Sequence, residues 1–478
     1  MRFCSVTLGC KVNQFETQAM ASILASRGHT PVQPGSGCDV CIINTCAVTA
    51  ESVRKSRQLV RRLRKTEPGA LIAVCGCYSQ LERAAVGALG ADLVGGSGRR
   101  RDFALEIEAM LIGHGAAKQG DGSSAWYQAE EPSPCLAASP CLAAAFEELP
   151  PGGASTRTRA LLKIQDGCDN FCAYCIVPYV RGRVRSLPVG RAAEQARQLD
   201  GQGFREIVIT GIEIASYGRD LVGKAENCPL SHEAENRPLS QEASPHIAPP
   251  PDLPSVVKAI AAAAPRARIR LGSLDPRIVT GEFCREMAAI PNLCNHFHLS
   301  LQSGCDATLR RMGRKYTGGE VLASIEMLRS DFPGCGITAD LITGFPGETD
   351  EEFEQSLEFI MEAGFSAMHI FPFSPRPGTR AAAMPGQVDK GVRIMRARRA
   401  SEAAAEMTRR FILGQTGKTV EVLFERKRGG FWTGHSANYL EVSVKNGGGK
   451  NQVVPVRITG VEDGVIWGEA EKCIMHNA

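Results

Sequence analysis

Short apolar runs rich in β-branched residues alternate with helical patterns over residues 1–113. The strand-like runs are residues 3–8, 39–43 and 70–74. Apolar positions at helical spacing occupy residues 16–26 and 52–65. This alternation predicts a parallel sheet covered by helices on both faces, which is a doubly wound α/β domain.

The same alternation continues over residues 157–390, where six strand-like runs are each followed by a helical pattern. The runs are residues 160–164, 206–210, 267–271, 296–301, 336–342 and 367–371. One helix start is especially clear, because Thr349 and Glu352 have capping-box spacing ahead of an apolar stripe. Six such units predict a partial (β/α)6 barrel, whose functional residues lie at the carboxyl ends of the strands.

The last part of the chain has a different pattern. Residues 391–412 are basic with helical spacing and predict a connecting helix, and residues 413–474 predict a small antiparallel β-barrel with OB-like size. The strand-like runs there are residues 419–425, 431–435, 439–445, 453–458 and 465–470. Four aromatic residues lie among its Arg and Lys residues: Phe424, Phe431, Trp432 and Tyr439. They suit stacking on unpaired bases, although some must form the barrel core.

Two tracts interrupt these patterns. Residues 114–156 are rich in Gly, Ser, Pro and Ala, repeat a six-residue unit at 133–144, and predict a low-complexity linker. Residues 221–251 contain a near-repeat at 225–242 and predict a surface insertion in the barrel domain. Neither tract can bury a core, so we expect its cysteine and histidine residues to stand outside the chemistry.

Composition and charge narrow the class of protein. The chain has 478 residues, 18 cysteines and a net charge of +4. No run of 18 apolar residues and no signal-peptide pattern occurs, so we expect a cytoplasmic protein without a membrane contact. In a reducing compartment the cysteines point to thiolate chemistry rather than disulfides. The Arg and Lys residues are clustered, which suits a polyanion such as RNA.

Three cysteines, Cys168, Cys172 and Cys175, form a CxxxCxxC loop after the run at 160–164. Three thiolates can hold a four-iron cluster and leave its fourth iron open for a substrate. A zinc knuckle would need a fourth ligand, and residues 176–231 offer only Cys228, in the predicted insertion. A redox disulfide uses thiols in pairs, whereas this motif offers three. We therefore favour an iron–sulfur cluster over both alternatives.

A second trio, Cys10, Cys46 and Cys77, follows the three strand-like runs of the first domain. The carboxyl ends of parallel strands meet at one edge of a sheet, so these cysteines should converge there. We therefore expect a second three-thiolate site. Three other cysteines lie inside or beside the runs and are interpreted as small buried hydrophobes: Cys4, Cys41 and Cys75.

Several motifs resemble the methylthiotransferases of the radical S-adenosylmethionine (SAM) superfamily. They are Thr-Leu-Gly-Cys-Lys-Val-Asn-Gln at 7–14, Asn-Thr-Cys at 44–46, Gly-Cys-Tyr at 76–78, the cysteine loop at 166–178, and Gly-His-Ser-Ala-Asn-Tyr at 434–439, which resembles a TRAM RNA-binding domain. The sequence of residues 9–14 is most similar to the motif of the family branch that acts on N6-threonylcarbamoyladenosine at tRNA position 37. The isopentenyladenosine branch usually has Gln-Met after the cysteine, and a third branch modifies a ribosomal-protein aspartate.

The resemblance implies a tRNA methylthiotransferase that inserts a methylthio group at C2 of the modified adenosine. It implies two [4Fe–4S] clusters, one catalytic on Cys168, Cys172 and Cys175, where SAM binds, and an auxiliary one on the second trio, Cys10, Cys46 and Cys77. Contacts to SAM would come from Tyr174, Glu213, Ser273, Gln302 and Gly344. Implied partners are the tRNA anticodon stem-loop, an electron donor such as flavodoxin or ferredoxin, and a sulfur source.

A protein of another class remains as the alternative. A non-catalytic iron–sulfur protein that binds RNA or senses redox state would account for the cysteines and the basic clusters. Such a protein would not need polar or Gly-rich loops at the carboxyl ends of six barrel strands. Binding of SAM would distinguish the two classes.

Overall fold

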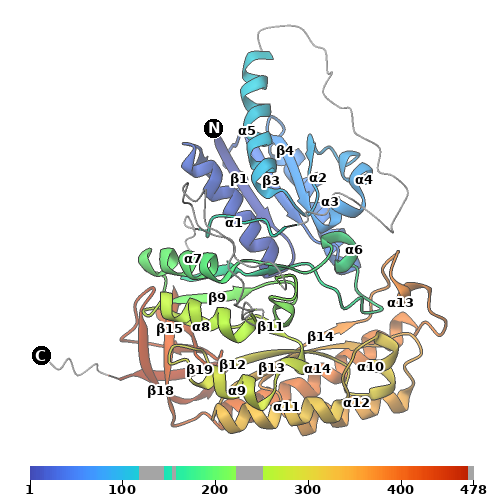
Figure 1. Ribbon diagram of the computed structural model, residues 1–478, viewed down its shortest axis with the longest axis vertical. Coiled ribbons are helices and arrows are strands. Elements are labelled where there is room, and N and C mark those ends of the chain that lie inside the picture. Colours follow the sequence, from blue (N-terminus) through green and yellow to red (C-terminus); the bar gives the residue numbers. More distant parts are fainter. Residues whose placement is uncertain (118–144, 153–157, 222–250, 472–478) are drawn as a thin grey trace, which may run out of the picture.

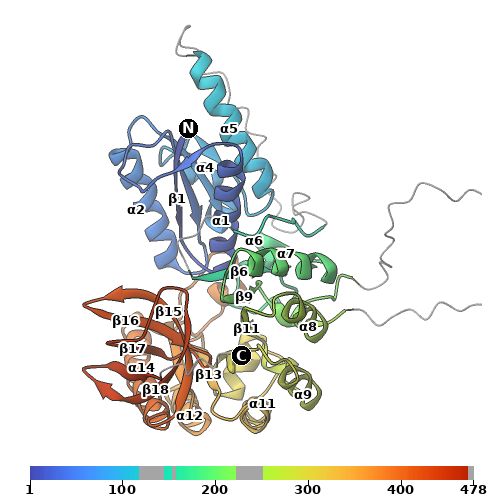
Figure 2. The same ribbon diagram turned by 90° about the vertical axis from the view of Figure 1, so that its left-hand side faces the viewer.

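The computed structural model describes residues 1–117, 145–152, 158–221 and 251–471 of the chain. An amino-terminal sheet lies at one end of the molecule, and the central strands with their helices lie next to it (Figure 1). A carboxy-terminal β-barrel lies beside these central elements (Figure 2). Within the described ranges, no helix is long and apolar enough to cross a membrane.

The amino-terminal sheet is parallel, with strand order β2-β1-β3-β4-β5. Its strands are β1 (Arg2–Thr7), β2 (Thr30–Pro31), β3 (Val40–Thr45), β4 (Leu71–Gly76) and β5 (Leu93–Val94). Helices α1 (Lys11–Ser26) and α5 (Arg100–Ala117) cover one face, and α2 (Ala50–Thr66), α3 (Cys77–Leu81) and α4 (Arg83–Gly87) cover the other. The predicted doubly wound fold is confirmed. Its strand order reverses between β1 and β3, where sheets of this kind bind ligands.

The central strands run parallel in two neighbouring sheets. The first contains β6 (Arg159–Lys163), β9 (Glu206–Thr210) and β10 (Arg268–Arg270); the second contains β11 (Ser273–Leu274), β12 (His296–Gln302), β13 (Gly336–Thr343) and β14 (Ala367–Pro372). A short antiparallel pair, β7 (Gln165–Asp166) and β8 (Arg185–Ser186), lies before and after the Cys168 loop. The six predicted strands are present, and the unpredicted β11 starts the second sheet.

Helices follow the central strands as the alternating pattern predicts. They are α6 (Val177–Arg181), α7 (Val189–Gly201), η1 (Ile214–Ser216), α8 (Leu253–Ala263), η2 (Pro276–Ile278), α9 (Gly281–Ala288), α10 (Asp306–Met312), α11 (Gly318–Asp331), α12 (Asp350–Ala363), α13 (Arg380–Ala383) and α14 (Lys390–Leu413). The capping box at α12 is confirmed, because Thr349 Oγ1 accepts from Glu352 N at 3.2 Å and the Glu352 carboxylate accepts from Thr349 N at 3.2 Å.

The carboxy-terminal strands form a closed barrel in the order β15-β16-β17-β19-β18. They are β15 (Thr419–Arg428), β16 (Phe431–Ser436), β17 (Glu441–Val444), β18 (Val453–Glu462) and β19 (Val465–Ala470). The prediction of a wholly antiparallel barrel is wrong for one pair, since β17 and β19 run parallel. Five strands cannot alternate in direction all the way around a closed ring, so one pair must be parallel. Phe424 belongs to the barrel core with no exposed surface, so it is one of the aromatic residues expected to form that core and is not available for base stacking.

Candidate functional site

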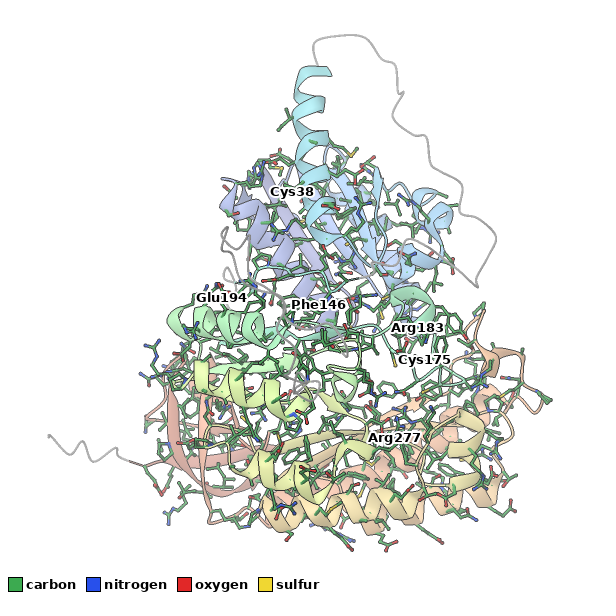
Figure 3. The ribbon with its side chains drawn as sticks, in the orientation of Figure 1. Cys38, Phe146, Cys175, Arg183, Glu194 and Arg277 are labelled. Atoms are coloured by element: carbon green, nitrogen blue, oxygen red, sulfur yellow. The ribbon has the colours of Figure 1, made fainter. Side chains whose placement is uncertain are left out.

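The loop with Cys168, Cys172 and Cys175 is held in place by three separate segments of the chain. Cys168 N donates to Gly182 O at 3.0 Å, Ala173 N donates to Met312 O at 2.8 Å, and Ala381 N donates to Ala173 O at 2.8 Å. Figure 3 shows Cys175 below α6, where the amino-terminal part of the molecule meets the central strands. Burial, together with the neighbouring Cys172 and Cys168 thiols, raises the pKa of the Cys175 thiol to about 12.

A buried arginine lies against this loop. Arg314 Nη1 donates to Cys172 Sγ at 3.3 Å, and Nη2 forms an ion pair with Asp275 at 3.3 Å. Asp275 also pairs with Arg277, at 2.9 Å. A cation at this position can offset the negative charge that metal-binding thiolates carry. Arg314 was not predicted, because it comes from a segment far along the chain that carries no motif.

The residues predicted to contact SAM differ in their burial and in their neighbours. Glu213 lies buried near Asp275 and Arg314; burial and the Asp275 carboxylate raise its pKa to about 7. Ser273 is exposed on β11, two residues before Asp275. Tyr174 lies within the cysteine loop.

The other two predicted contacts lie at strand ends. Gln302 ends β12 with a φ of +71°. Gly344 follows β13 and donates its N–H to Glu348 Oε2 at 2.6 Å, and its Cα packs against Arg393 of α14. The next residue, Phe345, contacts the Tyr174 ring edge-on, with 6.5 Å between the ring centroids. Gly344 therefore reaches the cysteine loop through Phe345, and its contact with SAM remains a prediction.

The second trio lies at the carboxyl edge of the amino-terminal sheet. Cys10 precedes α1, Cys46 follows β3, and Cys77 begins α3 after β4. Burial, together with the nearby Cys10 and Cys46 thiols, raises the pKa of the Cys77 thiol to about 12. The structure thus brings the three cysteines together at the strand ends, and their role as ligands remains a prediction.

Two glycines explain why this edge can gather three cysteines. Gly9 and Gly76 precede Cys10 and Cys77, and their φ values are +104° and +116°. A Cβ on Gly9 would lie 2.8 Å from Cys46 Cβ, and one on Gly76 would lie 2.3 Å from Thr45 O. Only glycine fits these positions, because both the backbone angle and the close approach of β3 exclude a side chain.

A second buried arginine lies beside this trio. Arg376, after β14, donates from Nε to Val48 O at 3.2 Å, and burial lowers its pKa while the Cys46 thiol opposes this. Its Nη2 has no hydrogen-bond partner among the described residues. A buried guanidinium with a free N–H suits an anionic group held by the three thiols. The residues present therefore fit a thiolate-bound cluster.

Two other groups of possible metal ligands are more tightly gathered. Within the described part of the chain, the ligand atoms lie within 4.8 Å of one another in the set Cys4, Cys38 and Cys41 and in the set His298, Asp340 and His369. Neither set is a predicted trio. In a four-iron cluster each thiolate binds a different iron, so its cysteine sulfurs stand farther apart than those around a single ion. In the second set, an ion pair of 3.3 Å between His298 and Asp340 accounts for the close approach.

A buried polar network connects the two predicted trios. Asn13, in α1, donates to Leu8 O at 2.9 Å and to Thr45 O at 3.0 Å, close to Cys10 and Cys46. Arg181 Nη2 donates to Asn13 Oδ1 at 2.7 Å, and Arg181 pairs with Asp166 at 3.1 Å. Asp166 in turn accepts from Gly167 N, directly before Cys168, at 2.8 Å.

Glu16 is the anionic centre of the same network. Its carboxylate pairs with Arg100 at 3.0 Å, Lys163 at 3.0 Å and Arg181 at 2.8 Å, and all four side chains are at most 2% exposed. These cations hold the pKa of Glu16 well below its usual range despite its burial. Glu16 and Arg100 come from helices that cover the amino-terminal sheet, whereas Lys163 and Arg181 come from the central part of the molecule. The network therefore joins these two parts.

Lys11, directly after Cys10, is a cation without an anionic partner. Its side chain is accessible, yet the surrounding protein desolvates the ammonium and lowers its pKa, as do Arg270 and Arg159. It forms no ion pair with a carboxylate of the described residues. Tyr439 lies beside it and stacks on His296 with 4.6 Å between ring centroids. An accessible ammonium without a carboxylate partner among the described residues suits an anionic ligand.

The comparisons with known proteins agree with this site. Residues 162–360 match the model of the radical SAM superfamily, and residues 2–96 match the uncharacterized protein family UPF0004. The chain is similar to the cobalamin-binding radical SAM methyltransferase TsrM from Kitasatospora setae, with a TM-score of 0.50 and 13% identity over 80% of this chain and 77% of that one. The fold is therefore that of a radical SAM enzyme.

Closer relatives define the family. The chain is 34% identical to the threonylcarbamoyladenosine tRNA methylthiotransferase MtaB of Bacillus subtilis, over 92% of this chain and 89% of the relative. It is 31% identical to the tRNA-2-methylthio-N(6)-dimethylallyladenosine synthase of Pelotomaculum thermopropionicum, over 95% and 94%. The chain belongs to the methylthiotransferase family of radical SAM enzymes. Such enzymes use SAM and carry two [4Fe–4S] clusters, and the non-catalytic alternative is wrong.

Proposed function

We propose that this enzyme inserts a methylthio group at C2 of N6-threonylcarbamoyladenosine at position 37 of tRNA. The observation that carries the proposal is the pair of cysteine trios joined by one buried network, with an unpaired lysine directly after Cys10. One trio alone would serve radical formation, whereas sulfur insertion needs the second.

Cys168, Cys172 and Cys175 are the proposed catalytic ligands, and Cys10, Cys46 and Cys77 the auxiliary ones. When bound, the cluster at the first trio would supply the electron that cleaves one SAM to methionine and a 5′-deoxyadenosyl radical, which takes the hydrogen from C2, and the auxiliary cluster would carry the sulfur that another SAM methylates before it is inserted there. Arg314 and Arg376 offset the negative charge of the thiolates at the two sites. Glu213 and Ser273 lie where they can hold the charged end of SAM.

The substrate assignment depends on Lys11. The threonyl group of N6-threonylcarbamoyladenosine carries a carboxylate, whereas the dimethylallyl group of the other branch is apolar. An ammonium that has no carboxylate partner among the described residues and lies near two further cations, Arg270 and Arg159, favours a ligand with a carboxylate over an apolar one. The third branch acts on a ribosomal protein and not on a nucleoside, and such a substrate would not require an RNA-binding barrel.

The carboxy-terminal barrel, residues 413–474, is the proposed TRAM domain that binds the anticodon stem-loop. Lys427 and Arg428 are exposed on the β15–β16 hairpin, next to the half-buried Phe431. Basic side chains there suit contacts with phosphates, whose strength falls as salt rises. We further propose that the enzyme acts in the cytoplasm, with electrons from flavodoxin or ferredoxin and sulfur from a separate donor.

Anaerobic reconstitution tests the two-cluster part of the proposal. Two four-iron clusters predict about eight irons per chain and reductant-dependent formation of 5′-deoxyadenosine. The Cys77→Ala variant should hold about four irons, since a four-iron cluster at the first trio would remain. An iron content of about four in the wild-type chain would contradict the auxiliary site.

Replacing Lys11 by glutamine should reduce kcat/KM for an anticodon stem-loop with N6-threonylcarbamoyladenosine by about 30-fold, or about 2 kcal/mol, because a charged partner of a desolvated carboxylate is lost. The measurement is methylthiolation followed by nucleoside mass spectrometry. Lys55→Gln is the matched control, since Lys55 is exposed on α2 and pairs with Glu51. If Lys11→Gln lowered 5′-deoxyadenosine formation in the absence of RNA as much as it lowered methylthiolation, Lys11 would not act through the RNA substrate.

A further inference from the structure

Three cysteines that the proposed function does not use meet beside the paired strands β1 and β3. Cys4 in β1 and Cys41 in β3 are partners across the parallel pair, and Cys38 comes from the loop before β3. Cys41 Sγ lies 3.2 Å from Cys4 Sγ and 3.3 Å from Cys38 Sγ. Cys4 and Cys41 are fully buried, and Cys38 is 9% exposed. Burial of Cys4 and Cys41 agrees with their interpretation as hydrophobes, but their convergence with Cys38 was not predicted.

This group is separate from the two trios of the proposed function. Cys10 and Cys46 follow the carboxyl ends of β1 and β3, whereas Cys4 and Cys41 lie nearer the amino-terminal ends of the same strands. Figure 3 shows Cys38 within the amino-terminal part of the molecule, well away from Cys175. A ligand bound there would not take part in the reaction directly.

The geometry favours a shared metal ion over a disulfide. Cys41 Sγ is nearly equidistant from the other two sulfurs, and a disulfide would pair it with one and leave the other thiol buried beside it. Three thiolates are a ligand set for soft ions such as Zn²⁺. Tetrahedral Zn–S bonds of about 2.3 Å place the sulfurs about 3.8 Å apart, so the two contacts of Cys41 Sγ need to lengthen by only about 0.5 Å. All three sulfurs already lie within 4.8 Å of one another.

The loop with Cys38 is fixed before any metal binds. The buried Glu67 carboxylate accepts from Gly35 N at 2.8 Å, Gly37 N at 3.3 Å and Cys38 N at 3.3 Å. On the other side, Asp39 Oδ2 accepts from Arg2 N at 2.7 Å. Preorganised ligands lose little freedom on binding, which favours affinity.

We propose that Cys4, Cys38 and Cys41 bind one Zn²⁺ ion as three thiolates. Each thiol loses its proton to solvent as its bond to zinc forms, and no oxidation takes place. The ion would cross-link β1, β3 and the loop before β3, and so stabilise the sheet edge that carries Cys10 and Cys46. Its role is structural, and it is independent of the proposed substrate.

The test uses the full chain with its iron sites filled by anaerobic reconstitution, and adds one equivalent of Zn²⁺ before gel filtration. The expected result is one zinc per chain by elemental analysis, with three sulfur neighbours at about 2.3 Å by zinc-edge X-ray absorption. Cys38→Ser, in a loop position, should lose the zinc and the rise in melting temperature that zinc causes. Cys75→Ser is the matched control, because Cys75 is buried in β4 of the same sheet but outside the group, and it should keep both.

Cys4→Ala, a second variant in a different element, should also lose the zinc. The proposal is wrong if the wild-type chain retains no zinc, if Cys38→Ser retains as much as wild type, or if fewer than three sulfurs surround the ion. Zinc bound adventitiously at the iron sites would persist in both variants and so count against the proposal.

Discussion

The Cys172→Ala variant should form no 5′-deoxyadenosine above the protein-free control, whereas Cys77→Ala should cleave SAM at the wild-type rate and insert no sulfur. Cys172 accepts a hydrogen bond from Arg314 in the loop where SAM is proposed to bind, and Cys77 lies at the edge of the amino-terminal sheet. The measurement is anaerobic incubation with dithionite, followed by chromatography of 5′-deoxyadenosine and mass spectrometry of the nucleosides.

The control for this pair is Cys284→Ala. Cys284 is buried in α9 and belongs to neither trio, so both activities should survive its replacement. The proposed division of roles would be contradicted by a Cys77→Ala protein that keeps its fold and about four irons but no longer cleaves SAM.

Replacing Glu16 by glutamine should destabilise the protein by about 3–5 kcal/mol, because it leaves buried cations without their common anion. Arg100, Lys163 and Arg181 all pair with this carboxylate and are at most 2% exposed. Chemical denaturation followed by circular dichroism measures the loss. Since the pKa of Glu16 is depressed in the folded state, its stabilisation is present above the unfolded pKa and is lost as the pH falls.

Glu354→Gln is the matched control for Glu16. Glu354 also pairs with an arginine, Arg399, but both side chains are more than 40% exposed. An exposed pair of this kind contributes about 0–1 kcal/mol, so its loss should be small. If the two substitutions lowered the free energy of unfolding equally, the buried network around Glu16 would not stabilise the contact between the amino-terminal and central parts of the molecule.

Much of the fold could be predicted because its signals are local. β-Branched runs mark β9 at the bounds the structure has, and the Thr349 capping box marks the start of α12. The convergence of Cys10, Cys46 and Cys77 was also predictable, since each follows a parallel strand. The parallel pair of β17 and β19 was missed because it follows from closing a ring of five strands, which no local pattern records.

The surroundings of the site were less predictable. Arg314 reaches the first trio from a segment without a motif, and nothing local to the strand-end loop after β14 shows that its Arg376 lies beside the second trio. Lys11 is unusual only because of the cations that the fold places around it. The network around Glu16 depends on cations from three elements, which a single charge in a helix does not reveal. Cys4 and Cys41 look like apolar packing in the sequence, and only the fold brings them together with Cys38. Cys135, Cys141, Cys228 and His232 lie outside the described residues.

The central claim is that this enzyme methylthiolates N6-threonylcarbamoyladenosine in tRNA. Mass spectrometry of tRNA nucleosides from cells with and without the gene tests it most directly. The account predicts that 2-methylthio-N6-threonylcarbamoyladenosine is present with the enzyme and absent without it, while its unmethylthiolated precursor accumulates. Loss of the methylthio group from the dimethylallyl nucleoside instead, with the threonylcarbamoyl product unchanged, would contradict the account.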